Sequence, residues 1–396
     1  MSHPKLLRPA RLAIEPLETR TLLSGGGITG GLPQAWSGSL AAAAPAIVSA
    51  TPFTSSSSIV KHLSAAPVIN SSTVPGNGDE NPYGVAFVPK GVAPGGKLHA
   101  GDVLVSNFNN SMNSQGTGTT IVDIAPDGQQ STFFQGLPGL GLTTALGVLK
   151  RGFVIVGNVP TTDGSFATIQ QGSLLILDKN GNQVANLTDS ALLDGPWDLT
   201  IDDEGSQAIV FVSNVLSGTV TRLVLEIPDH GNHIEVESKT QIASGYSHRG
   251  DPAALAIGPT GLAYDAATDT LFVASTGDNT IYSIAHARSR RTDAGTGTVV
   301  YHDDAHLRGP LGLVLAPNGD LITTNGDAVN PDPSQPSEIV EFTRSGKFVA
   351  QIPVDSTAQG GAFGIAIQVK GDDIQFAAVD DVTNSLKVWS FERVQR

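Results

Sequence analysis

Short apolar runs separated by turn residues recur along most of the chain. Val103–Asn107, Ile209–Asn214 and Leu271–Ser275 are typical: each is rich in β-branched or aromatic side chains and ends in a small or amide residue. Continuous apolar runs of this length, bounded by turn residues, predict strands that are buried on both faces. We therefore expect many short, buried strands.

A five-residue signal precedes each of these runs and reveals an internal repeat. Its third residue, the marker, is glycine in five copies and aspartate in one. The six markers are Gly84, Gly147, Asp198, Gly261, Gly312 and Gly364, with spacings of 63, 51, 63, 51 and 52 residues. A period near 50 with two longer intervals predicts six structural units, two of which contain insertions.

Each unit is expected to contain four antiparallel strands. In several units a tight turn follows the third strand, at Asp127–Gly128, Asn180–Gly181 and Ser345–Gly346. Such dipeptides supply the positive φ angles that short hairpins require. Four antiparallel strands per unit form the blade of a propeller. The last unit is one strand short, and we expect the segment Ala65–Asn70 to complete it and close the ring.

The units resemble NHL repeats, whose pattern is Pro-x-Gly-hydrophobic-Ala followed by a buried second strand and a third strand. Residues 259–284 and 310–325 carry the pattern best, and the resemblance extends over residues 80–392. It implies an all-β fold, a six-bladed β-propeller of four-stranded antiparallel blades.

Composition restricts the partners. The formal net charge is -14 and the pI is about 4.9, so the chain offers no broad basic face for nucleic acid. The chain contains no cysteine, which excludes disulfides and thiolate chemistry. No apolar run is long enough to cross a membrane. We expect a monomer that binds neither nucleic acid nor a membrane core.

The first 64 residues differ in composition from the rest. Residues 1–24 form a basic targeting arm, and Leu12–Ser24 resembles the LEP-LE-x-R-x-LLS motif near the N-terminus of many planctomycete surface and secreted proteins. The resemblance implies export, so we expect an extracellular, cell-surface or periplasmic location. Residues 25–64 are rich in Gly, Ser and Ala and predict a flexible low-complexity linker after this disordered arm. The propeller is expected to span residues 65–396.

The predicted binding site lies at one mouth of the central channel. In an antiparallel blade the first strand begins and the second strand ends on the same face, so both sets of residues gather there. Loops on a rigid frame are the usual place for recognition. The candidate ligand-binding residues are Asn81, Tyr83, Asn107, Asn158, Trp197, Asp198, Asn214, Asn325, Asp380 and Asp381. For strand-end Asn and Asp residues the alternative is a hydrogen bond to the following turn.

Two functions remain open. We expect a non-catalytic propeller, without a cofactor, that binds a protein or glycan through its channel mouth. The alternative is a lactonase or lyase that depends on a divalent metal such as calcium, because residues 260–275 are similar to part of the gluconolactonase-like propellers. Thr260 stands where that family has Asn, and Ala274 stands where it has Asp. The resemblance therefore implies the fold, and catalytic residues stay unassigned.

Overall fold

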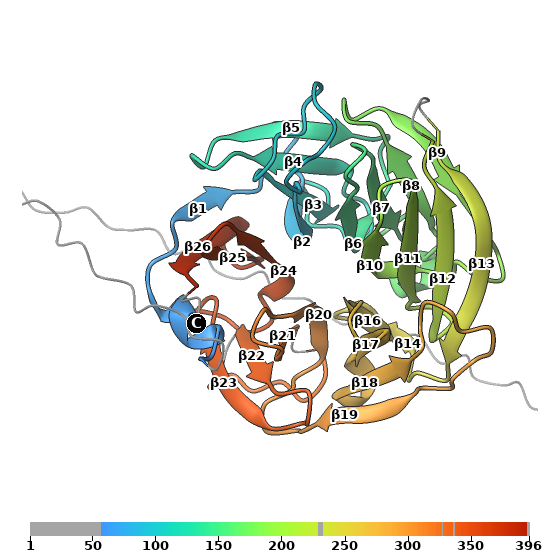
Figure 1. Cartoon of the computed structure of the whole chain (residues 1–396). Coiled ribbons are helices and arrows are strands. Elements are labelled where there is room, and N and C mark those ends of the chain that lie inside the picture. The colour runs from blue at the N-terminus through green and yellow to red at the C-terminus, as the bar shows by residue number, and fades with distance from the viewer. Residues whose placement is uncertain (1–56, 229–232, 327, 336, 394–396) are drawn as a thin grey trace, which may run out of the picture. The chain divides into compact units, whose positions relative to one another are not determined.

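The computed structural model describes residues 57–228, 233–326, 328–335 and 337–393, which belong to one compact unit. Within these residues, the strands form six four-stranded antiparallel sheets that surround a central channel as propeller blades (Figure 1). The all-β class and the six blades predicted from the sequence are confirmed. The targeting arm and most of the predicted linker lie outside the described residues.

The first three blades follow one another along the chain. Blade 1 contains β2 (Glu80–Phe87), β3 (Val103–Asn109), β4 (Thr120–Ile124) and β5 (Gln130–Gln135). Blade 2 contains β6 (Leu142–Val148), β7 (Val154–Asn158), β8 (Ser173–Leu177) and β9 (Gln183–Leu187). Blade 3 contains β10 (Pro196–Asp203), β11 (Gln207–Asn214), β12 (Thr219–Glu226) and β13 (Glu235–Ser244).

The remaining blades complete the ring. Blade 4 contains β16 (Pro259–Asp265), β17 (Thr270–Ser275), β18 (Thr280–Ala285) and β19 (Thr298–His302). Blade 5 contains β20 (Pro310–Leu315), β21 (Leu321–Asn325), β22 (Glu338–Phe342) and β23 (Phe348–Pro353). Blade 6 contains β24 (Ala362–Lys370), β25 (Asp373–Asp380), β26 (Ser385–Glu392) and, from the other end of the chain, β1 (Ile69–Ser72).

Three further short elements lie between these strands. The hairpin β14 (Arg249–Asp251) and β15 (Leu255–Ile257) connects blades 3 and 4. Short 3-10 turns occur at η2 (Phe166–Thr168) and η3 (Thr276–Asp278).

The ring closes through a strand from the N-terminal part of the chain, as the sequence predicted. β1 pairs antiparallel with β26, with Ile69 opposite Val388 and Ser72 opposite Ser385. The innermost strands β2, β6, β10, β16, β20 and β24 contact one another in sequence around the channel, and β24 returns to β2. Because β1 leads directly into blade 1 along the chain, its hydrogen bonds to β26 hold the first and last blades together.

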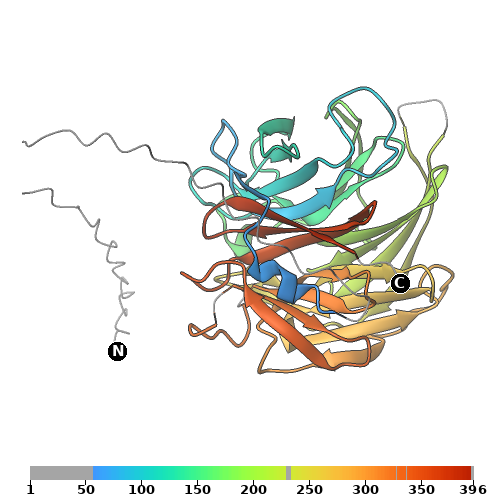
Figure 2. The same ribbon diagram turned by 60° about the vertical axis from the view of Figure 1, so that its left-hand side comes forward.

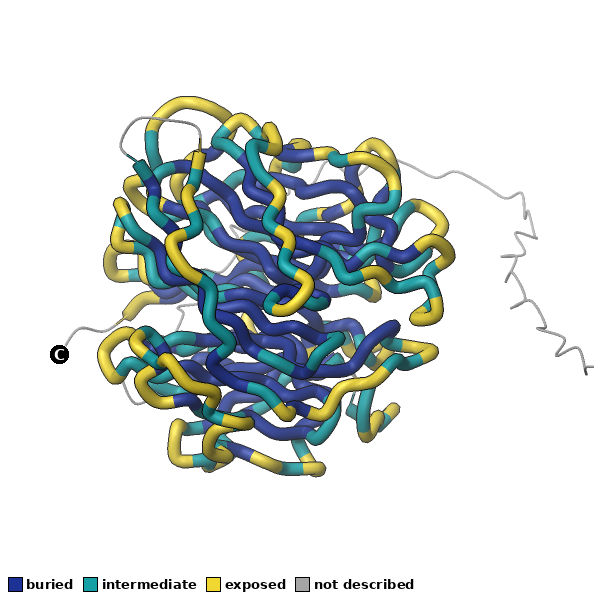
Figure 3. Tube along the Cα trace, turned by 90° about the vertical axis from the view of Figure 1, so that its right-hand side faces the viewer, coloured by how far each residue is buried: buried dark blue, intermediate teal, exposed yellow. Residues whose placement is uncertain are grey.

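The predicted hairpin turns are also present. Gly128, Gly181 and Gly346 have φ angles of +84°, +77° and +78° between the third and fourth strands of their blades. A side chain at these φ angles would be strained, and only glycine adopts them at no steric cost. Apolar side chains of neighbouring blades then pack between the sheets, and Figure 3 shows the resulting buried interior (dark blue) beneath exposed loops.

The marker glycines allow adjacent inner strands to approach closely. A Cβ at Gly364 would lie 1.9 Å from the carbonyl oxygen of Tyr83, and one at Gly261 would lie 2.4 Å from that of Leu311. The marker of blade 2 needs a correction. The strand pairing places Ala145, not Gly147, at the marker position. Three residues of β6 lie between its paired residues Leu142 and Leu146, whereas two residues of β2 lie between the equivalent residues Pro82 and Val85. The extra residue forms a bulge.

Residues before Ala65 also pack against the propeller. The 3-10 helix η1 (Val60–Ser64) lies against β22 and β23 of blade 5, and Figure 2 shows it in blue beside these strands. Ile59 and Val60 are buried, and their backbone N–H groups donate to the carboxylate of Glu341 at 3.1 and 3.0 Å. Residues 59–64 fall within the predicted linker, but they pack against blade 5. Among the described residues, no helix has the length and apolar character needed to cross a membrane.

Candidate functional site

A cavity of about 310 Å³ lies at the end of the channel where the inner strands begin. Asn81 and Tyr83 reach it from β2, Trp197 from β10, Leu311 from β20 and Phe363 from β24. Its volume is at the lower end of the range of about 300–1,000 Å³ that is typical of small-molecule sites. The cavity is therefore large enough for one small ligand or for one unit of a polymer.

Aromatic rings form one wall of this mouth cavity. Tyr83 packs against Phe108 and Phe363, with ring centroids 4.8 and 4.7 Å apart, and its edge contact with Trp197 is 5.9 Å. Tyr83, Trp197 and Phe363 occupy the same position of the repeat, directly before the marker. The repeat therefore brings three rings from three blades to one place, since each inner strand begins at this mouth.

Two loops that are far apart in the sequence meet over the cavity. Asn113 and Gln115 belong to the long β3–β4 connection of blade 1, whereas Ala253, Ala254 and Ala256 belong to the connection that contains β14 and β15. The Gln115 side-chain amide donates a hydrogen bond of 2.7 Å to the carbonyl oxygen of Ala253. This contact joins two loops that are 138 residues apart in the chain.

Three residues that line the mouth cavity carry a buried polar atom without a hydrogen-bond partner among the described residues. These atoms are the indole Nε1 of Trp197 and the amide oxygens of Asn81 and Asn109. A buried polar group without a partner costs about 1–3 kcal/mol. A ligand that accepts one hydrogen bond and donates two would recover this energy.

One carboxylate stands at the cavity rim among the described lining residues. Burial, together with the negative charges of Asp380 and Glu80, raises the pKa of Asp381 to about 7. Burial also raises the pKa of the Tyr83 phenol, with a contribution from Asp381. The rim can therefore exchange a proton near neutral pH, while the phenol stays protonated.

The strand-end amides predicted for the site have structural partners instead. Asn107, Asn158, Asn214 and Asn325 each donate a side-chain hydrogen bond to a carbonyl oxygen in the segment that leads into their own blade, at Thr73, Leu140, Leu192 and His306 respectively. They do not line the cavity. These amides therefore have a structural role, although the carbonyl that they bind belongs to the segment before their blade and not to the following turn that the sequence suggested.

Two predicted acidic residues also lie away from the cavity. Asp380 forms a buried ion pair with Lys387 at 2.8 Å and accepts from the Thr383 hydroxyl at 2.7 Å. Asp198 lines the opposite end of the channel, where its carboxylate accepts the N–H groups of Leu199 at 2.8 Å and Leu262 at 3.2 Å. Burial raises the pKa of Asp198 well above its usual range. Of the ten predicted residues, Asn81, Tyr83, Trp197 and Asp381 come together at the mouth.

Sequence reasoning missed the polar residues supplied by loops. Asn109 is the last residue of β3, two residues after the strand-end amide Asn107, and Asn113 and Gln115 lie in the β3–β4 connection. The longer spacing between the first two markers did not point to this loop, because it reflects the long β2–β3 connection at the opposite edge of blade 1. The position of the β3–β4 loop depends on its contact with a distant segment.

No protein-family model matches the sequence, and no curated protein matches it. Solved structures that are similar include a gluconolactonase of Xanthomonas campestris, with 14% identity over 80% of this chain and 87% of that chain and a TM-score of 0.46. A chain of a nidogen–laminin complex has 12% identity over 72% and 84%, with a TM-score of 0.46. A luciferin-regenerating enzyme has 9% identity over 81% and 94%, again with a TM-score of 0.46. Similarity at this level carries no conclusion about activity.

Proposed function

We propose that this propeller binds a glycan, with one sugar ring held in the mouth cavity, and that it does so without catalysis. The supporting observation is the pairing of an aromatic wall with the unpaired atoms of Trp197, Asn81 and Asn109. A sugar ring has apolar C–H faces that pack on aromatic rings, and its hydroxyl groups both donate and accept hydrogen bonds. A small ligand with both properties suits the site better than a broad protein surface.

The export motif predicted in residues 12–24, which lie outside the described residues, supports a role at the cell surface or beyond it. Glycans of the envelope or the surroundings would be accessible there. The proposed cell-surface location is therefore consistent with a glycan ligand.

The second candidate is the divalent-metal-dependent lactonase or lyase. Its supporting observation is that Asn81 and Asn109 present unpaired amide oxygens at a cavity that also contains the carboxylate of Asp381. Oxygen atoms of this kind are the ligands that calcium takes. Trp197 distinguishes the candidates, because an indole N–H donates to a sugar oxygen but cannot coordinate a cation.

The test is binding of the full chain to a glycan array, followed by titration calorimetry with the best glycan. Trp197→Phe keeps an aromatic ring but removes the N–H, and we expect it to lower affinity about 5–10-fold, the value of one hydrogen bond. The matched control is Trp389→Phe, since the Trp389 indole donates to Ala65 far from the cavity. It should leave the glycan affinity unchanged.

Other outcomes separate the alternatives. Calcium binding that is lost in Asn81→Ala and Asn109→Ala but kept in Trp197→Phe, together with lactone hydrolysis, would support the enzyme. If the chain bound a protein but no glycan, the glycan proposal would be wrong. The mouth would then remain a candidate surface for protein binding.

A further inference from the structure

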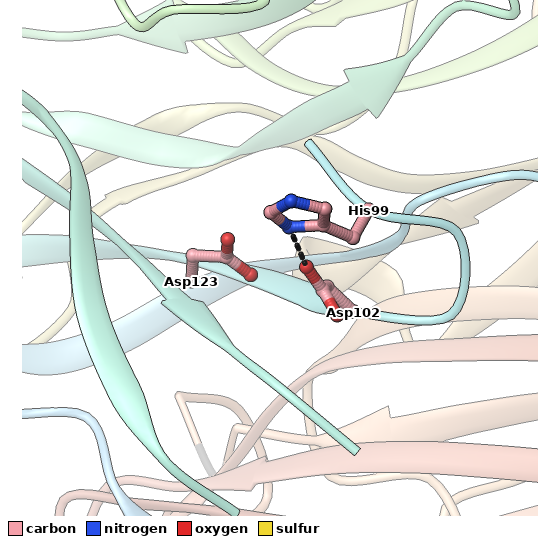
Figure 4. A group of neighbouring side chains, drawn as sticks. All are labelled: His99, Asp102 and Asp123. Carbon is pink, nitrogen blue, oxygen red and sulfur yellow. Dashed lines mark hydrogen bonds and ion pairs between the residues drawn. The ribbon is translucent and has the colours of Figure 1, made fainter. Parts of the chain in front are cut away.

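A second cluster of ligand-type side chains lies on blade 1, away from the mouth cavity. His99 and Asp102 belong to the β2–β3 connection, and Asp123 belongs to β4 (Figure 4). The mouth lies where β2 begins and β3 ends, whereas these three residues lie near the start of β3 and the end of β4. The cluster is therefore at the opposite edge of the blade, where it borders a surface cavity.

Local backbone structure explains why these residues meet. A turn brings His99 and Asp102 together, because the N–H of Asp102 donates to the carbonyl oxygen of His99 at 3.1 Å. Gly101 provides a φ of +97° in this turn. Leu104 is paired with Asp123 across β3 and β4, and Asp102 lies two residues before Leu104. Side chains two residues apart in an extended chain point to the same side, so both carboxylates face one direction.

The three side chains could hold a single ion. The imidazole Nδ1 of His99 is 3.2 Å from a carboxylate oxygen of Asp102, and one ligand atom from each of the three residues lies within 4.8 Å of the others. In the described part of the chain, this is the one group of three His, Cys, Asp or Glu residues with such spacing. Figure 4 shows the carboxylate of Asp123 directed toward the other two side chains.

Burial makes the cluster unusual. Asp102 is 4% exposed and Asp123 is 7% exposed, and the Oδ1 atom of Asp123 has no hydrogen-bond partner among the described residues. The nearby Lys97 ammonium instead donates to the carbonyl oxygens of Thr132 and Phe133. Two buried carboxylates at this distance repel one another and are poorly solvated. A bound cation would remove both penalties.

We propose that His99, Asp102 and Asp123 bind a divalent transition-metal ion, and that Zn²⁺ fits them best. Zinc commonly takes imidazole nitrogen together with carboxylate oxygen at about 2.0–2.2 Å, and three protein ligands leave a fourth position for water. Calcium and magnesium prefer oxygen ligands, so the imidazole favours a first-row transition metal. The His99 side chain is 74% exposed and can rotate to shorten its distance to the ion.

The inference does not depend on the glycan proposal. The ion would join the β2–β3 connection to β4, and it would stabilise the folded chain by binding only where all three ligands are assembled. Failure of glycan binding would leave this site untouched, and failure of metal binding would leave the mouth cavity untouched.

The experiment uses the full chain without a polyhistidine tag, after treatment with a chelator and its removal. Titration calorimetry with Zn²⁺ at pH 7.5 should show one tight site, and Zn²⁺ should raise the midpoint of thermal unfolding. His99→Ala should weaken binding at least about tenfold, because even outer-shell partners of a metal are worth about 10–100-fold in affinity. Absorption of the Co²⁺-substituted protein should report a coordinated, low-symmetry ion that is lost in the same variant.

Asp123→Asn supplies a second readout that a merely structural role would not give. Without metal this variant should unfold at a higher temperature than the wild type, because it removes one of two facing carboxylates. With Zn²⁺ it should gain less stability than the wild type. The control His233→Ala removes an exposed histidine that contacts a single carboxylate, Glu235, at 3.3 Å, and it should bind Zn²⁺ normally. Zinc binding that survives both His99→Ala and Asp123→Asn, or no binding at micromolar Zn²⁺, would overturn the proposal.

Discussion

Blades 3 and 6 place different residues at the same position of the repeat. Blade 6 has Phe363 followed by Gly364, and blade 3 has Trp197 followed by Asp198. Each aromatic ring lines the mouth cavity. At the marker, Gly364 touches the backbone of blade 1 directly, whereas the Asp198 carboxylate lies between β10 and β16 and accepts an N–H from each strand.

This difference shows how the fold uses its polar groups. The carboxylate oxygens of Asp198 each accept a backbone hydrogen bond, so this departure from the repeat supports the joint between blades 3 and 4. The N–H of neighbouring Trp197 has no partner. The hydrogen-bonded carboxylate of Asp198 thus supports the fold, whereas the unpaired N–H of Trp197 at the cavity is available to a ligand.

The largest expected effect comes from adding a methyl group to the marker of blade 6. Gly364→Ala would place a Cβ 1.9 Å from the Tyr83 carbonyl oxygen, so β24 and β2 must separate at the ring closure. We expect a loss of at least about 3 kcal/mol in the free energy of unfolding, measured by urea denaturation. Asp198→Ala adds no atom between β10 and β16, so its loss in the free energy of unfolding should be smaller. Equal losses would contradict the distinction between the two joints.

The raised pKa values of Asp381 and Asp198 predict that the stability of the fold depends on pH. The folded-state pKa of Asp381 is raised to about 7, so this group favours folding when protonated, and its contribution is lost as the pH rises through 7. Between pH 4 and 8 the free energy of unfolding of the wild type should therefore fall by about 1–3 kcal/mol relative to that of Asp381→Asn, allowing for partial exposure of the group. Denaturation curves of both proteins across this range measure the difference.

Asp198→Asn provides the comparison from blade 3. Burial raises the pKa of Asp198 well above its usual range, so the wild type should also lose stability relative to Asp198→Asn as the pH rises above the ordinary carboxyl pKa. Urea denaturation of both proteins between pH 4 and 8 measures this difference. A difference in stability that does not change with pH would contradict the burial of this carboxyl group.

The smallest effect concerns the strand-end amide of blade 3. Asn214 donates to Leu192 at 3.2 Å and accepts from the N–H of Asp194 at 3.1 Å, so it fixes the segment that enters its own blade. Asn214→Ala should cost about 1 kcal/mol of stability, and calorimetry should show unchanged glycan affinity. If Asn214→Ala lowered the glycan affinity without lowering stability, Asn214 would contribute to ligand binding after all.

Much of the fold could be predicted because the repeat is local. Each apolar run, marker and Asp-Gly or Asn-Gly turn specifies its own strand or hairpin, and the missing strand of blade 6 could be found by counting. The register of blade 2 was misassigned, since Gly147 resembles the marker while a bulge in β6 places Ala145 there. A bulge adds a residue without changing the pattern on either side of it.

The sequence by itself determined the six-bladed propeller, the face on which the inner strands begin, and the aromatic residues Tyr83 and Trp197 at that face. Only the tertiary structure showed that Gln115 reaches Ala253 over the mouth, and that His99, Asp102 and Asp123 meet at the opposite edge of blade 1. Strand patterns repeat because each blade must bury the same two faces. Loop contacts and side-chain clusters depend on which distant segments the closed ring brings together, and no local pattern records that.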